Sequence, residues 1–370
     1  MRRMRLGLDV RLTYYSRGGI AKYVRRLAAA LPDLAPEHAH YHFYRRGHTE
    51  HFAQAARRLD CWTPAHHRLE TWALAAELLP HRLDLFHSPD FIPPRAGARR
   101  HVITVHDLAF LRYPQFLTAE SRRYYNGQIA SAVRRAHAIS ADSHATKADL
   151  VELLHVPAEK VTVIHLGLDP EFRRRPAEAV AAVLARHRLT AGCVLFVGTF
   201  EPRKNVPTLL HAYARLRAAA PDAPPLVLAG LKGWLFDETM QLAAELGLAD
   251  HLRFFENFPS ADLPELYSAA GVLVLPSHYE GFGFPVLEAM GCETPVIIAD
   301  RSSLPEVAGE AALKINPDDP EDLAEALRRA LSDTALRAEL VRRGLERVNA
   351  FTWEQTARAT LQLYERVLAG

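Results

Sequence analysis

The sequence predicts an α/β protein of two domains, each with a parallel sheet covered by helices. Short apolar runs of strand length alternate with segments of helical periodicity along both halves of the chain, an order typical of such sheets. The chain has 370 residues, which exceeds what one hydrophobic core usually supports. A connection rich in Arg, Pro and Ala, from Asp169 to Ala191, separates the two halves.

The first half opens with strand-like residues Leu6 to Val10, followed by a loop that ends in Gly18-Gly19-Ile20. Apolar residues then recur with helical spacing from Tyr23 to Leu31. Further strands are expected at residues 83–87, 101–106, 138–142 and 161–165, and the clearest helix at 119–137. This alternation predicts a Rossmann-like domain over residues 1–170.

The second half repeats this architecture. Strand-like runs cover residues 194–197, 226–229, 252–254, 272–275 and 295–298, with helical periodicity between them. We expect a second Rossmann-like domain over residues 171–350, facing the first across a cleft, because open α/β sheets bind ligands at the carboxyl ends of their strands. A helix over residues 351–370 is expected to fold back on the first domain.

The composition is 49% apolar and 24% charged, and no apolar run approaches the roughly 18 residues that span a bilayer. The basic N-terminus leads directly into a strand-like segment without a signal-peptide core, so we expect a cytoplasmic protein. The cysteines Cys61, Cys193 and Cys292 are far apart and lack metal-ligand spacing. They indicate small buried positions rather than disulfides or a zinc site.

The charge is unevenly distributed along the chain. Residues 1–170 hold 24 Lys and Arg against 16 Asp and Glu, whereas the remainder holds 21 against 27. A basic first half suggests an anionic partner, although an arginine-rich solvated surface explains it equally well. One expected helix is basic and aromatic and could dock peripherally on the anionic inner face of the cell membrane, or present a solvated face; it contains Arg122, Arg123, Tyr124, Tyr125, Arg134 and Arg135.

The most informative segment runs from Pro276 to Ala289, where a buried strand leads into a glycine-bearing loop and then a helix beginning near Pro285. Amides at such a helix N-terminus, with those exposed by Gly281 and Gly283, suit a diphosphate. Two carboxylates flank this anion site, Glu280 before it and Glu288 inside the helix. A carboxylate accepts paired hydrogen bonds from vicinal hydroxyls, so Glu280 could bind a sugar ring and Glu288 a ribose. Two polyols joined by a diphosphate describe a nucleotide sugar.

A second element follows the strand at residues 194–197, where Gly198 begins a loop that carries Arg203 and Lys204. Adjacent cations at the carboxyl edge of a sheet could bind the diphosphate and stabilise the departing nucleotide; the alternative is a solvated charge pair. No Asp-x-Asp pair follows a strand, and Asp318-Asp319 lies in a proline-bounded turn. We therefore expect neither a metal nor a cofactor, with the nucleotide sugar acting as substrate.

These motifs resemble those of the retaining glycosyltransferases of family 4, which have the two-domain GT-B fold. The resemblance covers nearly the whole chain and is strongest to mannosyltransferases. Glu280 and Glu288 match the family's Glu-x7-Glu motif, and Gly18-Gly19 its glycine turn facing the diphosphate. The segments Ser302 to Gly309 and Phe351-Thr-Trp353 also resemble family segments. One departure is Gly198-Thr199, where many members have Gly-Arg, so both diphosphate cations are assigned to Arg203 and Lys204.

The resemblance implies roles for individual residues. Glu280 and the backbone from Phe282 through Gly283 to Phe284 would contact sugar and phosphates, and Glu288 the ribose. His106, in Thr104-Val-His106-Asp107, would lie beside the transferred sugar. A histidine satisfied at the sheet edge is the alternative for His106, and a tight turn is the alternative for Gly19.

Two further groups are weaker candidates. Gly230, Asn257 and Phe258 follow strands where a nucleobase could rest, although loop or core duty explains them as well. Ser143, Thr146 and Lys147 begin a helix and could meet an acceptor phosphate, although capping explains the first two equally well.

The function expected from the sequence is transfer of a hexose to a hydroxyl of a glycan or lipid-linked acceptor, in polysaccharide biosynthesis. Retention at the anomeric carbon is what the resemblance implies. GDP-mannose is the first choice of donor and UDP-glucose the second. The alternatives are a nucleotide-sugar epimerase of the same architecture and a non-enzymatic nucleotide-sugar-binding scaffold.

Overall fold

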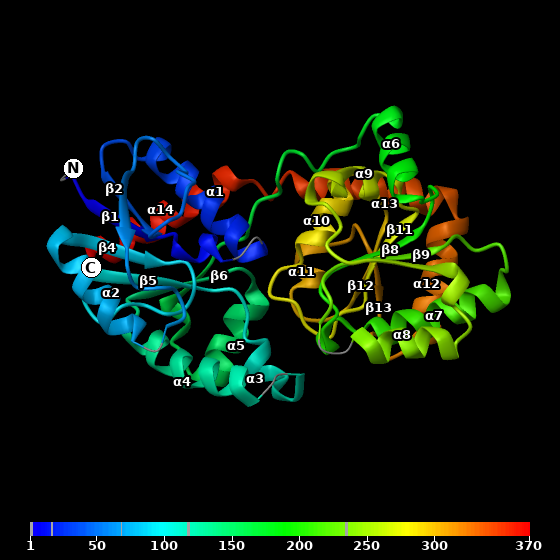
Figure 1. Ribbon diagram of the computed structural model, residues 1–370, viewed down its shortest axis with the longest axis horizontal. Helices are drawn as coiled ribbons and strands as arrows, with labels where there is room; N and C mark the ends of the chain where they lie inside the picture. The colour runs from blue at the N-terminus through cyan, green and yellow to red at the C-terminus, as the bar shows by residue number, and fades with distance from the viewer. Residues whose placement is uncertain (1–2, 16–17, 68, 117–118, 234–235) are drawn as a thin grey trace. The chain divides into compact units, whose positions relative to one another are not determined.

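The computed structural model describes residues 3–15, 18–67, 69–116, 119–233 and 236–370, and the side chains of residues 116–126 lie outside that description. The chain forms two compact units (Figure 1). Unit 1 comprises residues 1–167 and 351–370, and unit 2 comprises residues 168–350. Each unit is an α/β layer structure around one parallel sheet, as the sequence predicts.

Unit 1 is built on a seven-stranded sheet in the order β3-β2-β1-β4-β5-β6-β7, and every recorded pairing is parallel. The order reverses between β1 and β4, which makes this pair the topological switch point of the sheet. The strands are β1 (Arg5–Asp9), β2 (Ala39–Arg45), β3 (Arg57–Cys61), β4 (Leu83–Ser88), β5 (Ala98–Val105), β6 (Ala138–Ala141) and β7 (Val161–Val163). The α-helices are α1 (Gly19–Leu34), α2 (Glu70–Leu78), α3 (Ala109–Arg112), α4 (Ala119–Arg135), α5 (His144–Leu154) and α14 (Trp353–Ala369).

Unit 2 has a six-stranded parallel sheet in the order β10-β9-β8-β11-β12-β13, with its switch point between β8 and β11. The strands are β8 (Val194–Val197), β9 (Leu226–Ala229), β10 (Leu252–Phe255), β11 (Val272–Leu275), β12 (Val296–Ala299) and β13 (Leu313–Ile315). The α-helices are α6 (Ala177–His187), α7 (Val206–Ala219), α8 (Phe236–Glu245), α9 (Leu263–Ala269), α10 (Phe284–Gly291), α11 (Leu304–Ala308), α12 (Pro320–Ser332) and α13 (Thr334–Val348).

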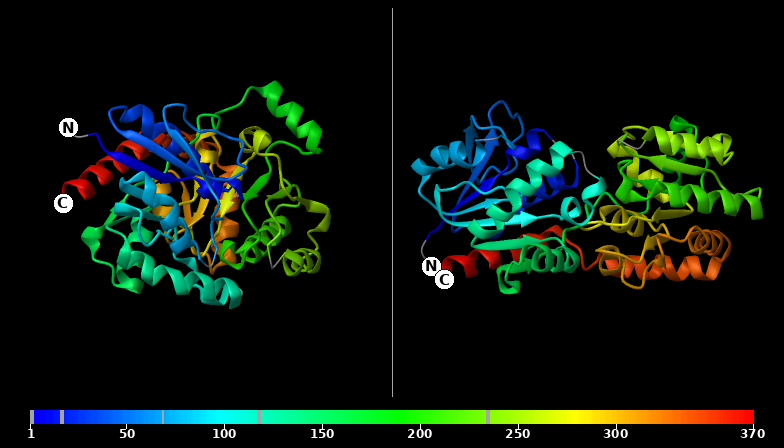
Figure 2. Two further views of the ribbon diagram at one scale, coloured as in Figure 1. Left: turned by 60° about the vertical axis from the view of Figure 1, so that its left-hand side comes forward. Right: turned by 90° about the horizontal axis from the view of Figure 1, so that it is seen from below.

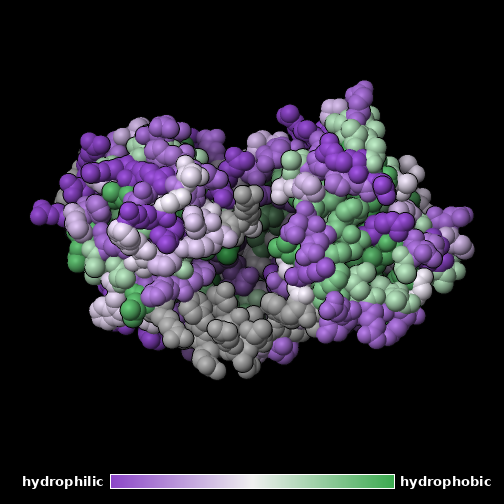
Figure 3. Space-filling view, viewed as in Figure 1, coloured by the Kyte–Doolittle hydropathy of each residue, from purple (hydrophilic) through white to green (hydrophobic). Residues whose placement is uncertain are grey.

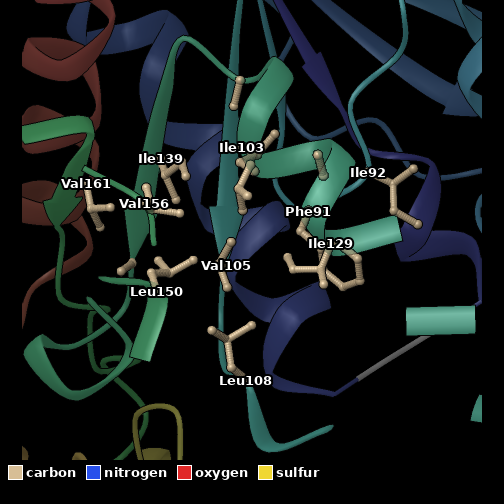
Figure 4. Packing of buried hydrophobic residues seen from close by; sticks show 14 of the residues in the cluster. Phe91, Ile92, Ile103, Val105, Leu108, Ile129, Ile139, Leu150, Val156 and Val161 are labelled. Atoms are coloured by element: carbon tan, nitrogen blue, oxygen red, sulfur yellow. The ribbon is translucent and has the colours of Figure 1, made fainter. Parts of the chain in front are cut away.

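Buried strands that are apolar on both faces explain why the central pairs form. The sequence of β11 is Val-Leu-Val-Leu and all four residues are buried, as expected for a parallel strand covered on both sides. In unit 1, one core cluster joins Ile103 and Val105 of β5 to Ile139 of β6, Ile129 of α4 and Leu150 of α5 (Figure 4). The three cysteines are buried and free, as predicted.

Some strands at the edges of the sheets carry no sequence signal that predicts them. β2 and β3 are rich in His, Tyr and Arg, and β13 has three residues, so none shows an apolar run. The connection expected at residues 169–191 contains the helix α6, whose alanines and arginines leave a single buried residue, Val183. Among the described residues no helix combines the length and apolarity needed to cross a membrane, and the face of unit 1 seen in Figure 3 is mostly hydrophilic.

The C-terminal helix α14 packs in unit 1 against α1, β4, β5 and β6 (Figure 2). Its first turn is fixed by a capping box between Thr352 and Gln355. Farther along, the Tyr364 hydroxyl lies 2.7 Å from Nδ1 of His87, whose Nε2 lies 2.8 Å from the Thr104 hydroxyl. Burial lowers the pKa of His87 to about 3, so the imidazole is neutral and each ring nitrogen has a hydroxyl partner.

We expect Tyr364→Phe to lower the free energy of unfolding by about 1–3 kcal/mol, because Nδ1 of His87 then loses its partner in a fully buried position. Urea denaturation monitored by circular dichroism measures this change. The control is Tyr14→Phe, since the Tyr14 ring is 50% exposed and the substitution should change stability by less than about 0.5 kcal/mol. Equal effects of the two substitutions would contradict the role of the Tyr364 hydroxyl.

Candidate active site

The loop between β11 and α10 is shaped by glycine and proline, as the sequence predicts. Gly283 has φ of +108° at the N-cap of α10, a conformation that favours glycine. A Cβ there would lie 2.8 Å from Cδ2 of Leu304. Pro285 stands in the first turn of α10, where its missing N–H costs no hydrogen bond. The loop thereby delivers Glu280 and the aromatic pair Phe282 and Phe284 to the N-terminal end of this helix.

Two serines before α11 hold this loop in place. The single O–H of Ser303 is shared between two acceptors, the carbonyl oxygen of Glu280 at 2.9 Å and that of Phe282 at 2.8 Å. The Ser302 hydroxyl accepts a 2.9 Å hydrogen bond from the Glu280 amide. The start of the segment from Ser302 to Gly309, which resembles a family segment, therefore fixes the loop that carries Glu280 by hydrogen bonds.

The Glu280 carboxylate is the centre of a buried ion cluster. Lys204 Nζ donates to its Oε1 at 2.6 Å, Arg203 donates to Oε2 at 3.1 Å, and Ser277 donates to Oε1 at 2.8 Å. Burial raises the pKa of Glu280, but Lys204 and Arg203 outweigh burial and hold this pKa below its usual value. Arg203 also donates to Glu201 at 2.7 Å, so the cluster balances two cations with two carboxylates.

Asn205 connects the cluster to the surrounding loops. It follows the short helix Pro202–Lys204, adopts a left-handed conformation with φ of +54°, and starts α7. Its side-chain amide donates to the carbonyl oxygens of Pro276 at 3.1 Å and Pro317 at 2.7 Å. Asn205 thereby fixes the loop after β8 to the loop after β11. The solvated-pair alternative for Arg203 and Lys204 is wrong, because Lys204 is 8% exposed and both cations form ion pairs with Glu280.

Glu288 lies inside α10 and is also buried, at 6% exposure. The Tyr267 hydroxyl of α9 donates to its Oε2 at 2.9 Å. Burial raises the pKa of Tyr267 well above its usual value, so this phenol remains a donor. Sequence reasoning missed Tyr267, because nothing in the spacing of residues 267 and 288 links the two side chains before the fold does.

The three candidates for nucleobase binding, Gly230, Asn257 and Phe258, follow strands β9 and β10. A Cβ on Gly230 would lie 1.8 Å from the carbonyl oxygen of Gly198, so the ends of β8 and β9 approach too closely for a side chain. Asn257 is exposed with φ of +55°, and the Phe258 ring packs 4.5 Å from that of His187. These contacts support the loop or core alternative for Gly230 and Phe258, and Asn257 lies in an exposed turn.

In unit 1, His106 follows β5 with partners at both ring nitrogens. Nδ1 lies 2.7 Å from Oδ2 of Asp142, and Nε2 lies 2.8 Å from the carbonyl oxygen of Pro89. Burial lowers the pKa of His106, but the Asp142 carboxylate outweighs burial and raises it to about 9. At neutral pH the ring is an imidazolium that donates from both nitrogens, so it has no lone pair with which to accept a proton.

The candidates for an acceptor phosphate take part in local structure. Ser143 caps α5 by accepting the Thr146 amide at 3.1 Å, and the Thr146 hydroxyl donates to the His106 carbonyl at 3.2 Å. Lys147 Nζ donates to the carbonyl oxygen of Val161 at 2.8 Å. The capping alternative for Ser143 and Thr146 is therefore confirmed, and Lys147 fixes α5 to β7.

The remaining candidates of unit 1 lie at the start of α1 and in α4. Gly18 has φ of −71° and is the N-cap of α1, whose first residue is Gly19, so both glycines lie at the N-terminus of this helix. The side chains of Arg122, Arg123, Tyr124 and Tyr125 lie outside the described residues. Arg134 is exposed in the last turn of α4, and Arg135 donates to the Pro93 carbonyl at 3.1 Å. Within the described ranges, no cluster of His, Cys, Asp and Glu could hold a metal ion.

The His106–Asp142 pair makes the stability of unit 1 depend on pH. Because the folded pKa is about 9 against 6.5 in the unfolded chain, we expect the pair to stabilise fully below pH 6.5 and to lose this effect as pH rises through about 9. His106→Gln should therefore be less stable by roughly 3 kcal/mol at pH 6, with the pH-dependent part of the difference gone by pH 10. Urea denaturation from pH 6 to 10 measures it, and a difference independent of pH would contradict the charged pair.

Comparisons with known proteins match both halves of the chain. Residues 186–347 match the family model described as glycosyl transferases group 1, and residues 17–172 match glycosyltransferase family 4. O-antigen chain mannosyltransferase B from Escherichia coli is 32% identical over 309 residues, which cover 83% of this chain and 80% of that protein. The serotype-specific mannosyltransferase WbdA from Escherichia coli is 32% identical over 251 residues, 67% of this chain, and the match spans 31% of its length.

The fold is shared with solved structures of known enzymes. Sucrose-phosphate synthase from Thermosynechococcus elongatus superimposes with a TM-score of 0.79 at 26% identity, covering 99% of this chain and 100% of that one. The matched family models, the Glu-x7-Glu motif and two parallel-sheet Rossmann-like units agree with one another. The chain therefore belongs to glycosyltransferase family 4 and is a glycosyltransferase of the GT-B fold.

Proposed function

We propose that this glycosyltransferase moves a hexose from a nucleoside diphosphate sugar to a hydroxyl of a glycan or lipid-linked acceptor, with retention at the anomeric carbon. The observation that carries the proposal is the buried cluster of Arg203, Lys204 and Glu280 beside the N-terminus of α10. It combines positive charge for a diphosphate with a carboxylate for sugar hydroxyls, in one place and without a metal ligand set.

Each residue of the cluster then has a chemical task. Arg203, Lys204 and the N-terminus of α10 bind the diphosphate and stabilise the charge that develops on it. Glu280 accepts hydrogen bonds from hydroxyls of the hexose, and Glu288, oriented by Tyr267, accepts them from the ribose. The names of the two Escherichia coli relatives favour mannose, so GDP-mannose is the first donor to test and UDP-glucose the second.

The proposed reaction is a front-face displacement. The bond between the anomeric carbon and the phosphate oxygen breaks, the acceptor oxygen bonds to the same face, and its proton passes to an oxygen of the departing diphosphate. His106 is a poor alternative for this proton, because both of its ring nitrogens already donate. The two cations supply the positive charge that a metal would otherwise supply, so we propose a metal-independent reaction without a cofactor.

The rival functions differ in what the assay would show. Family models for glycosyltransferases over both halves disfavour the epimerase. The scaffold alternative predicts donor binding without turnover. We also propose a cytoplasmic location, with peripheral contact with the anionic inner face of the cell membrane through the basic N-terminal domain.

The decisive experiment incubates the purified chain with GDP, UDP, ADP and dTDP sugars and measures thermal stabilisation and release of the nucleotide. We expect one donor to raise the melting temperature and to be turned over, with the anomeric configuration retained by NMR and the rate unchanged by EDTA. Lys204→Met should lower kcat about 100- to 1000-fold, since it removes stabilisation of the leaving group.

Arg215→Ala is the matched control for loss of a cation, because Arg215 is exposed on α7 and pairs with Glu321 on the surface. It should leave kcat unchanged. If no donor is hydrolysed or transferred, or if Lys204→Met turns over donor as fast as the control, the proposal is wrong.

A further inference from the structure

A basic hollow lies in unit 1 at the amino ends of β5, β6 and β7. It has a volume of about 430 Å³ and opens to solvent, and sites for small molecules typically measure about 300–1,000 Å³. Apolar residues of α14 form part of its wall. The polar side chains that line it are Arg100, His137, Glu159, Lys160, Thr162 and Arg366.

Three of these side chains carry positive charges that no carboxylate neutralises. Arg100, Lys160 and Arg366 form no ion pair with any residue that the structure describes, and neither does the exposed Glu159. Burial and the charges of Arg100 and Lys160 lower the pKa of His137, which lines the same hollow. The hollow is therefore electropositive, and this favours the binding of an anion.

Contacts with the protein hold these cations in place and leave them donors for a ligand. Arg100 Nε donates to the Val367 carbonyl at 3.2 Å, and Arg366 donates to the Thr162 hydroxyl at 3.1 Å. A guanidinium has five N–H donors, so each arginine retains several for a ligand. Lys160 Nζ donates to two backbone carbonyl oxygens near the end of α4, at 2.6 and 3.1 Å, and an ammonium group has a third N–H.

His137 adds a further donor to the hollow, because its tautomer is fixed. The His101 amide donates to Nδ1 of His137 at 3.0 Å, so in the neutral ring the proton is on Nε2. The two imidazoles stack with their centroids 6.2 Å apart, which orients the ring of His137. Side chains from the starts of three strands and from one helix therefore bring N–H groups to the same hollow.

We propose that this hollow binds a phosphate-bearing ligand. The planar guanidinium groups of Arg100 and Arg366 match pairs of phosphate oxygens. A phosphomonoester carries a charge of about −1.5 to −2 at pH 7, which balances several uncompensated cations better than the single charge of a carboxylate does. The volume of the hollow leaves room for more of the ligand than its phosphate group.

The hollow is separate from the carboxyl ends of the strands in unit 1. Arg100 lies near the start of β5 and His106 directly follows its end, about 20 Å away along the strand. A phosphate at the amino ends therefore takes no part in chemistry beside His106. It would instead join Arg366 of α14 to Arg100 of β5, and so fasten the C-terminal helix to the sheet of unit 1.

Calorimetric titration of the full chain with inorganic phosphate and with pyrophosphate, at constant ionic strength in chloride, tests the site. We expect both anions to bind, and pyrophosphate to bind more tightly. Arg100→Gln should weaken binding about 10- to 100-fold, and the more exposed Arg366→Gln about three- to tenfold, because each removes a charged donor. Glu159→Gln should tighten binding about two- to fivefold by removing a repelling charge, a gain that a misfolded variant cannot show.

Arg57→Gln, at an exposed arginine of β3, is the matched control and should leave binding unchanged. Tighter binding of glycerol 3-phosphate than of inorganic phosphate identifies a free phosphorylated ligand. Binding to phosphatidylglycerol vesicles that Arg100→Gln weakens identifies a lipid headgroup. The site is overturned if neither phosphate nor pyrophosphate binds, if Arg100→Gln and Glu159→Gln bind them as the control does, or if Lys204→Met in unit 2 abolishes the binding.

Discussion

The buried carboxylate of Glu280 is the constraint on which the geometry of unit 2 depends. A buried charge is costly unless partners compensate it, and here Lys204, Arg203 and Ser277 do so from two different loops. The loop after β8, the loop after β11 and the serines after β12 must therefore all be in place for Glu280 to be charged and held. The same contacts hold both cations at the sheet edge, which is the preorganisation that the proposed electrostatic catalysis requires.

Unit 1 also compensates buried charges at the edge of its sheet, with different residues. Arg11 is fully buried among Asp9, Glu70 and a backbone carbonyl, and His106 is charged against Asp142. Behind the sheet, the hydroxyl of Tyr364 on α14 meets His87, so the C-terminal helix contributes to the polar interior of this unit. Both units thus place compensated charges where the carboxyl ends of central strands meet, the position where such sheets bind ligands.

The sequence predicts the central strands and the charged residues Arg203, Lys204 and Glu280, because apolar runs and glycine or proline at turns are local signals, but it does not predict Ser277 or Asn205. Edge strands β2, β3 and β13 are missed since solvent contact removes their apolar run. The ion pair between Lys204 and Glu280 joins residues 76 positions apart, and no spacing rule reveals it. Tyr267 escapes detection for the same reason, because its importance arises from the hydrogen bond to Glu288 that only the fold defines.

In the proposed function, Glu280 recognises the sugar while Arg203 and Lys204 bind the diphosphate. Calorimetric titration of GDP and GDP-mannose into the wild type, Glu280→Gln and the control Glu201→Gln separates these tasks. We predict that Glu280→Gln weakens GDP-mannose about 10- to 100-fold more than GDP, because a charged hydrogen-bond acceptor for the hexose is lost, whereas Glu201→Gln affects both ligands equally. Equal loss of GDP and GDP-mannose in Glu280→Gln would show that Glu280 only supports the loop and would contradict the account.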